Sequence, residues 1–126
     1  MLRDMLWISV GAVLGANLRY VVYRLGAVIA PAATFPYPTL VINIVGSFLL
    51  AVFAFLVADR ALADPKWRLL FAIGFCGSFT TFSTFALESY RLYATGRTGL
   101  LTLNILVSNA ACILAVFAGA ALERTL

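Results

Sequence analysis

Four stretches of mostly apolar residues, each long enough to cross a bilayer, constrain this chain more than any other feature. A transmembrane helix needs about 20 such residues. The stretches run over residues 5–23, 39–58, 67–93 and 100–122. They occupy most of the 126 residues, so we expect one domain over residues 1–126. The pattern predicts an all-α membrane protein with four transmembrane helices.

The composition agrees with a membrane protein and argues against several soluble classes. Charged residues make up 11% of the chain, against about 25% in soluble domains. The nine Lys and Arg outnumber the five Asp and Glu, but they stand singly near span ends, so we expect no nucleic acid partner. There is no His, and no nucleophile–base pair or metal cluster is apparent, so we expect neither an enzyme nor an organic cofactor.

The first apolar run also has the length of a signal-peptide core, which spans about 7–15 residues. Apolar residues resume after Asn17 and Arg19. This continuation favours a retained first helix.

The loop charges are nearly balanced across the membrane. Four spans place both termini on one side, and that side carries five basic residues: Arg3, Arg60, Lys66, Arg68 and Arg124. The other side carries four: Arg19, Arg24, Arg91 and Arg97. Orientation normally follows an asymmetry in this count. The near-tie is compatible with two orientations, and so with an antiparallel homodimer, and equally with a single orientation fixed by one or two charges.

Small residues recur every four positions in two spans. They are Gly11 and Gly15 in the first span, and Ala111, Ala115 and Gly119 in the fourth. Such faces let helices approach closely in lipid. They predict tight packing within or between subunits.

The third stretch contains a segment that is a poor transmembrane helix. Residues 74–85 read Gly-Phe-Cys-Gly-Ser-Phe-Thr-Thr-Phe-Ser-Thr-Phe. Glycine and β-branched threonine lower helix propensity, and hydroxyl groups compete for backbone hydrogen bonds. Irregular backbone within a membrane is tolerated only where protein or a wet cavity surrounds it. We therefore expect a third helix broken near its middle, beside a path for a small polar species.

Other polar side chains lie at membrane depth. Asn43 lies in the second span, and Asn104, Ser108 and Cys112 are four apart on one face of the fourth. Each polar group could simply bond a neighbouring helix, and a shared polar track is at least as good an interpretation. A track of amide and hydroxyl donors with few carboxylates suits an anion, which Arg19 could concentrate at a mouth.

Phe82 and Phe85 are three apart and share a helix face. Their ring edges are weakly electropositive and could touch an anion, although filling gaps between helices is the simpler interpretation of the spacing. A break near Gly77 would also leave carbonyl groups without helical partners. Such carbonyls can hold a small cation such as Na⁺.

These features resemble the Fluc (CrcB) family of bacterial fluoride channels over essentially the whole chain. The matching segments are Gly15-Ala16-Asn17-Leu18-Arg19, Thr39-Leu40-Val41-Ile42-Asn43 and the block at 74–85. The last segment is long and unusual, and it makes the resemblance specific.

The resemblance implies a fluoride-selective channel that exports F⁻ passively and so reduces fluoride toxicity. It implies an antiparallel dual-topology homodimer in the bacterial inner membrane, with two pores between subunits. The implied pore residues are Phe82, Phe85 and Asn43, with the track of Asn104, Ser108 and Cys112. A structural Na⁺ would be held by backbone carbonyls of Gly77 and Thr80, and the remaining hydroxyls near the break are Thr81, Ser83 and Thr84.

The chain departs from the family pattern at three positions. The family often has glycine at Ser78, an aliphatic residue at Phe79 and a hydroxyl at Cys112, where a thiol is a poorer donor. The alternative function is a small dual-topology proton-coupled drug exporter. That class needs an acid in the middle of its first helix, and none is present here. A non-transporting assembly subunit would explain the small-residue faces but not the hydroxyl-rich block.

Overall fold

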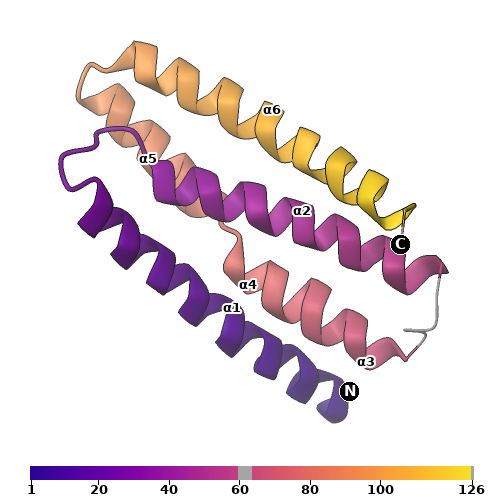
Figure 1. Cartoon of the computed structure of the whole chain (residues 1–126). Helices are drawn as coiled ribbons and strands as arrows, with labels where there is room; N and C mark the ends of the chain where they lie inside the picture. The colour runs from indigo at the N-terminus through magenta and orange to yellow at the C-terminus, as the bar shows by residue number, and fades with distance from the viewer. Residues whose placement is uncertain (60–63, 126) are drawn as a thin grey trace.

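The structure, a computed structural model, describes residues 1–59 and 64–125. The helices in chain order are α1 (Leu2–Ile29), α2 (Tyr37–Asp59), α3 (Pro65–Trp67), η1 (Arg68–Cys76), α4 (Gly77–Phe79), α5 (Phe82–Ala94) and α6 (Thr98–Glu123). Segments α3 to α5 follow one another along the third span, and no strand occurs in these ranges. Figure 1 shows the N- and C-termini at the same end of the helices.

All four predicted spans are confirmed as helices that are long and apolar enough to cross a membrane. They cover Leu2–Ile29, Tyr37–Leu56, Pro65–Ala94 and Thr98–Leu122. The first is longer than the predicted 5–23, because the helix continues to Ile29. Ala30, the residue before Pro31, is not helical (φ −135°, ψ 64°). A residue that precedes proline is disfavoured in helical conformation.

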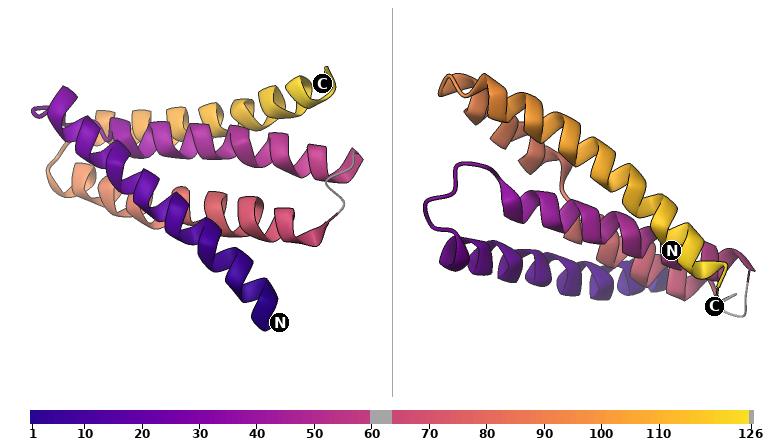
Figure 2. Two further views of the ribbon diagram at one scale, coloured as in Figure 1. Left: turned by 60° about the horizontal axis from the view of Figure 1, so that its bottom comes forward. Right: turned by 45° about the horizontal axis from the view of Figure 1, so that its top comes forward.

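The first and third spans meet along a face of glycines, with α1 crossing the other helices at an angle (Figure 2). Gly11 and Gly15 are buried and one α-helical turn apart. Leu70 and Phe75 belong to η1, a π-helix, whose turn is wider than that of an α-helix. The carbonyl oxygen of Leu70 lies against Gly11, and that of Phe75 lies against Gly15. A Cβ at either glycine would overlap these oxygens. The predicted small-residue face of the first span therefore serves packing within one chain.

The fourth span packs against the second in the same way. A Cβ at Gly119 would lie 2.6 Å from the carbonyl oxygen of Phe48. Ala115 on α6 and Ala51 on α2 are also buried. The α2–α6 pair therefore uses small residues to bring two backbones close together.

Large apolar side chains remain exposed along the outside of the helices, as a lipid-facing surface requires. Leu106, Leu114 and Phe117 on α6 are examples, each more than half exposed. A soluble monomer rarely exposes so continuous an apolar surface. The buried interior is small and includes Ile42, Phe79 and Cys76.

Candidate functional site

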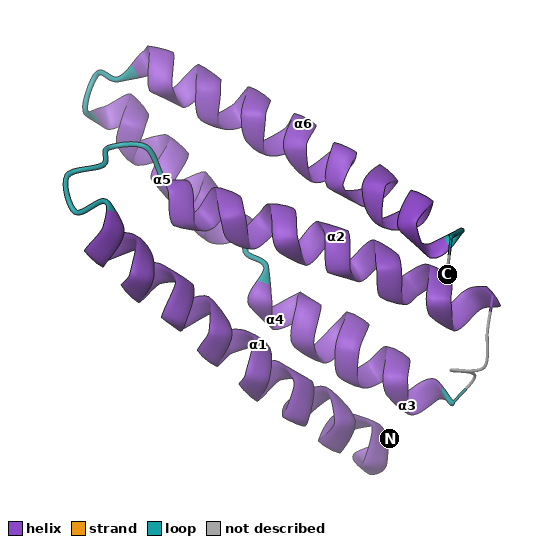
Figure 3. Cartoon of the chain, viewed as in Figure 1, coloured by secondary structure: helices purple, strands orange, loops and turns teal. Residues whose placement is uncertain are grey.

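The third span loses helical geometry at two consecutive residues. Thr80 (φ −74°, ψ 158°) and Thr81 (φ −153°, ψ 110°) are extended between the end of α4 and the start of α5 (Figure 3). Gly77, where the sequence suggested a break, is itself helical. The extended residues lie three positions later, where two threonines adjoin. We call Thr80 and Thr81 the discontinuity.

Hydroxyl groups cap both sides of the discontinuity. The Thr80 backbone N–H (3.0 Å) and Oγ1 (2.9 Å) both donate to the Cys76 carbonyl and end α4. Thr81 is the N-cap of α5, where its Oγ1 accepts from the Thr84 N–H (3.2 Å) and donates to Thr84 Oγ1 (2.9 Å). Ser83 Oγ lies 3.4 Å from Thr81 Oγ1. The predicted hydroxyl cluster thus gathers at the first turn of α5.

Side chains from the first two spans reach the backbone of the discontinuity. Asn43 on α2 accepts from the Thr81 N–H at 2.8 Å and donates to the Thr81 carbonyl at 3.1 Å. Arg19 Nη1 on α1 donates to the Thr80 carbonyl at 3.4 Å. The tertiary structure therefore joins three spans at two residues that have no complete helical bonding.

The two aromatic residues after the discontinuity lie side by side. The ring centroids of Phe82 and Phe85 are 5.5 Å apart, with the planes tilted by 47°. Phe82 is 77% exposed at the start of α5, whereas Phe85 is half-buried. Phe82 therefore presents its ring outside the single chain, next to the hydroxyl cluster.

The two bulky departures beside the discontinuity are both accommodated. Phe79 is 2% exposed and stacks on Phe75, with ring centroids 5.7 Å apart. The Ser78 hydroxyl bonds the Gly74 carbonyl (2.7 Å) and reaches the Ala12 carbonyl on α1 (3.0 Å). Serine here adds a polar contact between the first and third spans.

The polar residues of the fourth span form a separate group. Asn104, 1% exposed, donates to Ser89 Oγ on α5 at 3.0 Å, and Ser108 Oγ donates to Asn104 Oδ1 at 3.2 Å. Cys112 on the same face is half-buried and free. Within the described chain no hydrogen bond links this group to Asn43. Ser89 was missed, because a lone serine in an apolar helix carries no sequence signal for its partner.

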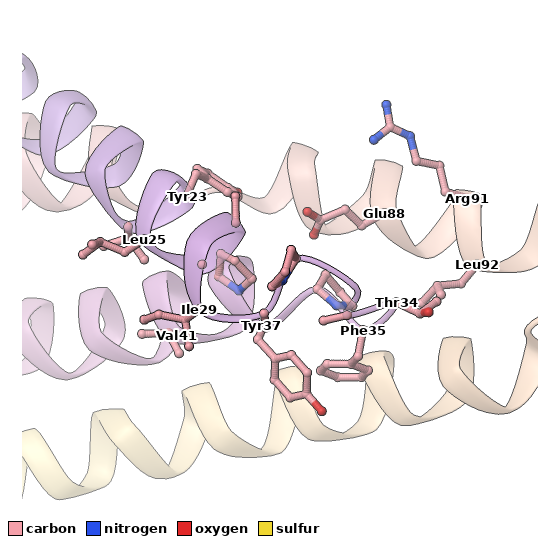
Figure 4. Close-up of a pocket in the computed structure, with 18 of the residues that line it drawn as sticks. Tyr23, Leu25, Ile29, Thr34, Phe35, Tyr37, Val41, Glu88, Arg91 and Leu92 are labelled. Atoms are coloured by element: carbon pink, nitrogen blue, oxygen red, sulfur yellow. The ribbon is translucent and has the colours of Figure 1, made fainter.

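A cavity of about 1170 Å³ opens at the loop end of the molecule, between the end of α1, the loop before α2 and the end of α5. Figure 4 shows Glu88 and Arg91 beside it, with Tyr23 and Phe35 among its lining. Tyr23 Oη lies 2.8 Å from Thr39 Oγ1, and Glu88 Oε2 is buried without a hydrogen-bond partner in the described chain.

This cavity lies about two helical turns from the discontinuity, with Glu88 in its lining and Thr39 bonded to its lining residue Tyr23. Thr39 precedes Asn43 by one turn of α2, and Glu88 follows Thr84 by one turn of α5. The sequence alone did not indicate Tyr23 or Thr39 as site residues, because their meeting depends on how α1 and α2 pack.

The fold and site define a small helical membrane protein whose third span carries a polar, hydroxyl-rich discontinuity. The family model of CrcB-like proteins, described as camphor resistance (CrcB), matches residues 6–120. A relative from Koribacter versatilis (strain Ellin345), named fluoride-specific ion channel FluC, is 46% identical over 99% of this chain and 98% of its own length. Relatives with the same name from Sulfurihydrogenibium sp. (strain YO3AOP1), at 40% identity, and Paramagnetospirillum magneticum (strain ATCC 700264 / AMB-1), at 42%, cover 94% and 89% of this chain and 95% and 88% of their own.

The chain therefore belongs to the CrcB (Fluc) family, as its sequence motifs indicated. Together with the four spans, this makes it a multi-pass bacterial membrane protein. The relatives are named as ion channels, which agrees with the expectation that the chain is not an enzyme.

Proposed function

We propose that this protein is a fluoride-selective channel through which F⁻ leaves the cytoplasm down its gradient. The observation that carries the proposal is a 46% identical relative, named as a fluoride-specific channel, that matches nearly the full length of both chains. Acid outside a cell loads fluoride as HF, which dissociates inside. A passive path for the anion then limits its accumulation and toxicity.

The chemistry of the discontinuity supports an anion as the permeating species. Thr81, Ser83 and Thr84 supply hydroxyls, and Phe82 and Phe85 supply ring edges with weak positive potential. Hydrogen-bond donors set close together can replace the water shell of a small anion.

The cavity at the loop end serves, in this proposal, as the aqueous entrance. Two arginines, Arg91 and Arg97, and one acid, Glu88, are among its lining residues. A net positive mouth raises the local concentration of anions. Thr39 and Thr84 would then connect the entrance with Asn43 along the two helix faces.

The proposed assembly is an antiparallel dual-topology homodimer with two pores between subunits. The exposed ring of Phe82 supports it, and the near-tie in loop charge is compatible with it. Asn104 and Ser108 form hydrogen bonds within this chain, to Ser89 and to each other. In the pore they exchange these bonds for bonds to the ion, next to Cys112.

A structural Na⁺ would be held at the dimer centre by the carbonyls of Gly77 and Thr80 from both subunits. The residues fit such an ion. Gly77 is exposed, and a Cβ added there would lie 3.9 Å from its nearest neighbour, the Ala72 carbonyl oxygen. Among the described residues the Thr80 carbonyl accepts a single long bond, 3.4 Å, from Arg19, so a lone pair remains for a cation. The ion would supply positive charge that links the two chains.

Ion efflux from proteoliposomes tests the channel. We expect fluoride to leave vesicles that contain the protein much faster than chloride, with protein-free vesicles as the control. Equal rates for the two halides, or no fluoride flux, would contradict the proposal.

The assembly has its own tests. Tags at each terminus should be found on both membrane faces, and a single orientation would rule out dual topology. Replacing Na⁺ by a larger organic cation should weaken the dimer, and an unchanged dimer would argue against the carbonyl site. The proton-coupled exporter is not favoured, because Asp4 in the first turn is the sole acid of α1.

A further inference from the structure

Asn43 makes a paired contact that a pore-lining side chain does not need. Its Oδ1 accepts from the Thr81 N–H at 2.8 Å, while its Nδ2 donates to the Thr81 carbonyl at 3.1 Å. Both backbone groups of a single extended residue are therefore satisfied by one side chain, from a helix 38 positions away in sequence.

The physical need for this contact comes from the membrane. The Thr81 N–H makes no helical bond, because it points to Asn43 instead. A buried backbone group without a partner is costly where no water can reach it. Thr81 is 6% exposed. A carboxamide offers a donor and an acceptor on one planar fork, whereas a carboxylate only accepts.

Close packing holds the two segments in register. A Cβ at Gly46, one turn after Asn43 on α2, would overlap the Thr80 methyl group and lie 3.3 Å from the Phe79 ring. The second span thus presses against the discontinuity at one turn and hydrogen-bonds to it at the turn before.

We infer that Asn43 is a positioning residue that holds Thr81 extended and so sets the direction of the first turn of α5, which carries Phe82 and Phe85. One Nδ2 hydrogen remains for an ion, but the amide acts chiefly through Thr81. The consequence for ion flux rests on the proposed function, whereas the backbone contact does not.

Amide hydrogen exchange tests the contact. The full-length protein, labelled with ¹⁵N-threonine in micelles, is compared with Asn43→Ala and Asn43→Asp. In the alanine variant we expect the Thr81 amide to exchange about tenfold faster, because a hydrogen bond of ordinary net strength is lost. In the aspartate variant the acceptor remains, so Thr81 exchange should stay close to that of the unmodified protein.

The Thr80 amide provides an internal control, because it donates to the Cys76 carbonyl within the same span. Its exchange should not change in either variant. Equal Thr81 exchange in the unmodified protein and Asn43→Ala would overturn the inference.

A double-substitution cycle on fluoride efflux tests whether Asn43 works through Thr81. Replacing the Thr81 amide by an ester removes its N–H, and an ester at Thr95, whose N–H donates to the Arg91 carbonyl, is the matched control. We expect Asn43→Ala and the Thr81 ester to slow efflux by similar factors, with little further loss when combined, whereas the Thr95 ester adds independently.

Additive effects of Asn43→Ala and the Thr81 ester would mean that Asn43 acts on the ion directly, which overturns the positioning role. Unchanged efflux in Asn43→Ala would also overturn it. Absence of flux in the unmodified protein would overturn the proposed function, and Thr81 exchange would still decide whether the contact exists.

Discussion

Two of the polar regions within the described spans, the discontinuity and the group on α6, meet different physical requirements. At the discontinuity, Asn43 and Arg19 bond to backbone groups of Thr81 and Thr80. On α6, Asn104 bonds to the side chains of Ser89 and Ser108. Substitution can remove all the side chains of a polar group together. Backbone N–H and carbonyl groups remain after any substitution and still need partners. The first region should therefore tolerate substitution much less than the second.

The largest effect on stability is expected from a larger side chain at the position where α2 packs against the discontinuity. Gly46→Val should lower the free energy of unfolding by about 3 kcal/mol, because the added carbons overlap Thr80 and crowd Phe79. Gly99→Val is the matched control, since a Cβ there meets nothing within 4 Å. Denaturant titration in micelles measures both. Similar losses would mean that the contact at Gly46 is not tight.

The α6 group should respond to single and combined substitutions differently. Asn104→Ala should cost about 1–3 kcal/mol, because it leaves buried hydroxyls of Ser89 and Ser108 without their partner. Asn104→Leu combined with Ser89→Ala and Ser108→Ala should recover most of this loss. A triple variant as unstable as Asn104→Ala would show that this region also satisfies backbone groups, which substitution cannot remove.

The serine beside the discontinuity tests how far the first region extends. Ser78→Ala should cost about 1 kcal/mol, because one hydrogen bond toward Gly74 and Ala12 is lost while the helix is kept. Ser78→Gly should cost about 1 kcal/mol more, since glycine weakens a helix interior. A cost near that of Gly46→Val would place Ser78 among the residues that the discontinuity requires.

A site outside both regions should give the smallest effect. The side-chain and backbone hydrogen bonds from Lys66 hold the pKa of Asp64 below its ordinary value. Asp64 thus adds stability above the pKa that it has in the unfolded chain and loses it as the pH falls through its lowered folded value. The stability difference between the unmodified protein and Asp64→Asn should shrink over that acidic range. The site is exposed, so the change should be slight.

The four spans could be predicted because length and hydropathy are local properties of the chain. The segment at 74–85 was recognisable as a poor helix for the same reason, since its glycines and threonines act on their own backbone. The end of α1 was placed too early, because Arg24 does not stop the helix, which continues to Ile29, two residues before Pro31.

The pairing of the polar residues could not be predicted. The sequence singled out Asn43, Asn104 and Ser108, but nothing local told which group each would bond. Thr39 and Ser89 were not considered as partners, although they bond Tyr23 and Asn104. Such bonds depend on the rotation and depth of one helix against another.

The amino-acid sequence determined that the chain spans a membrane four times and that residues 74–85 resist a regular helix. Each follows from the free energy of a short segment in lipid or water. The tertiary structure decided where the discontinuity falls. Thr81 is extended beside Asn43, whose amide satisfies both its backbone groups, and Gly77 stays helical. Irregular backbone in a membrane must be surrounded by protein or a wet cavity, and here another helix brings the side chain that completes its hydrogen bonds.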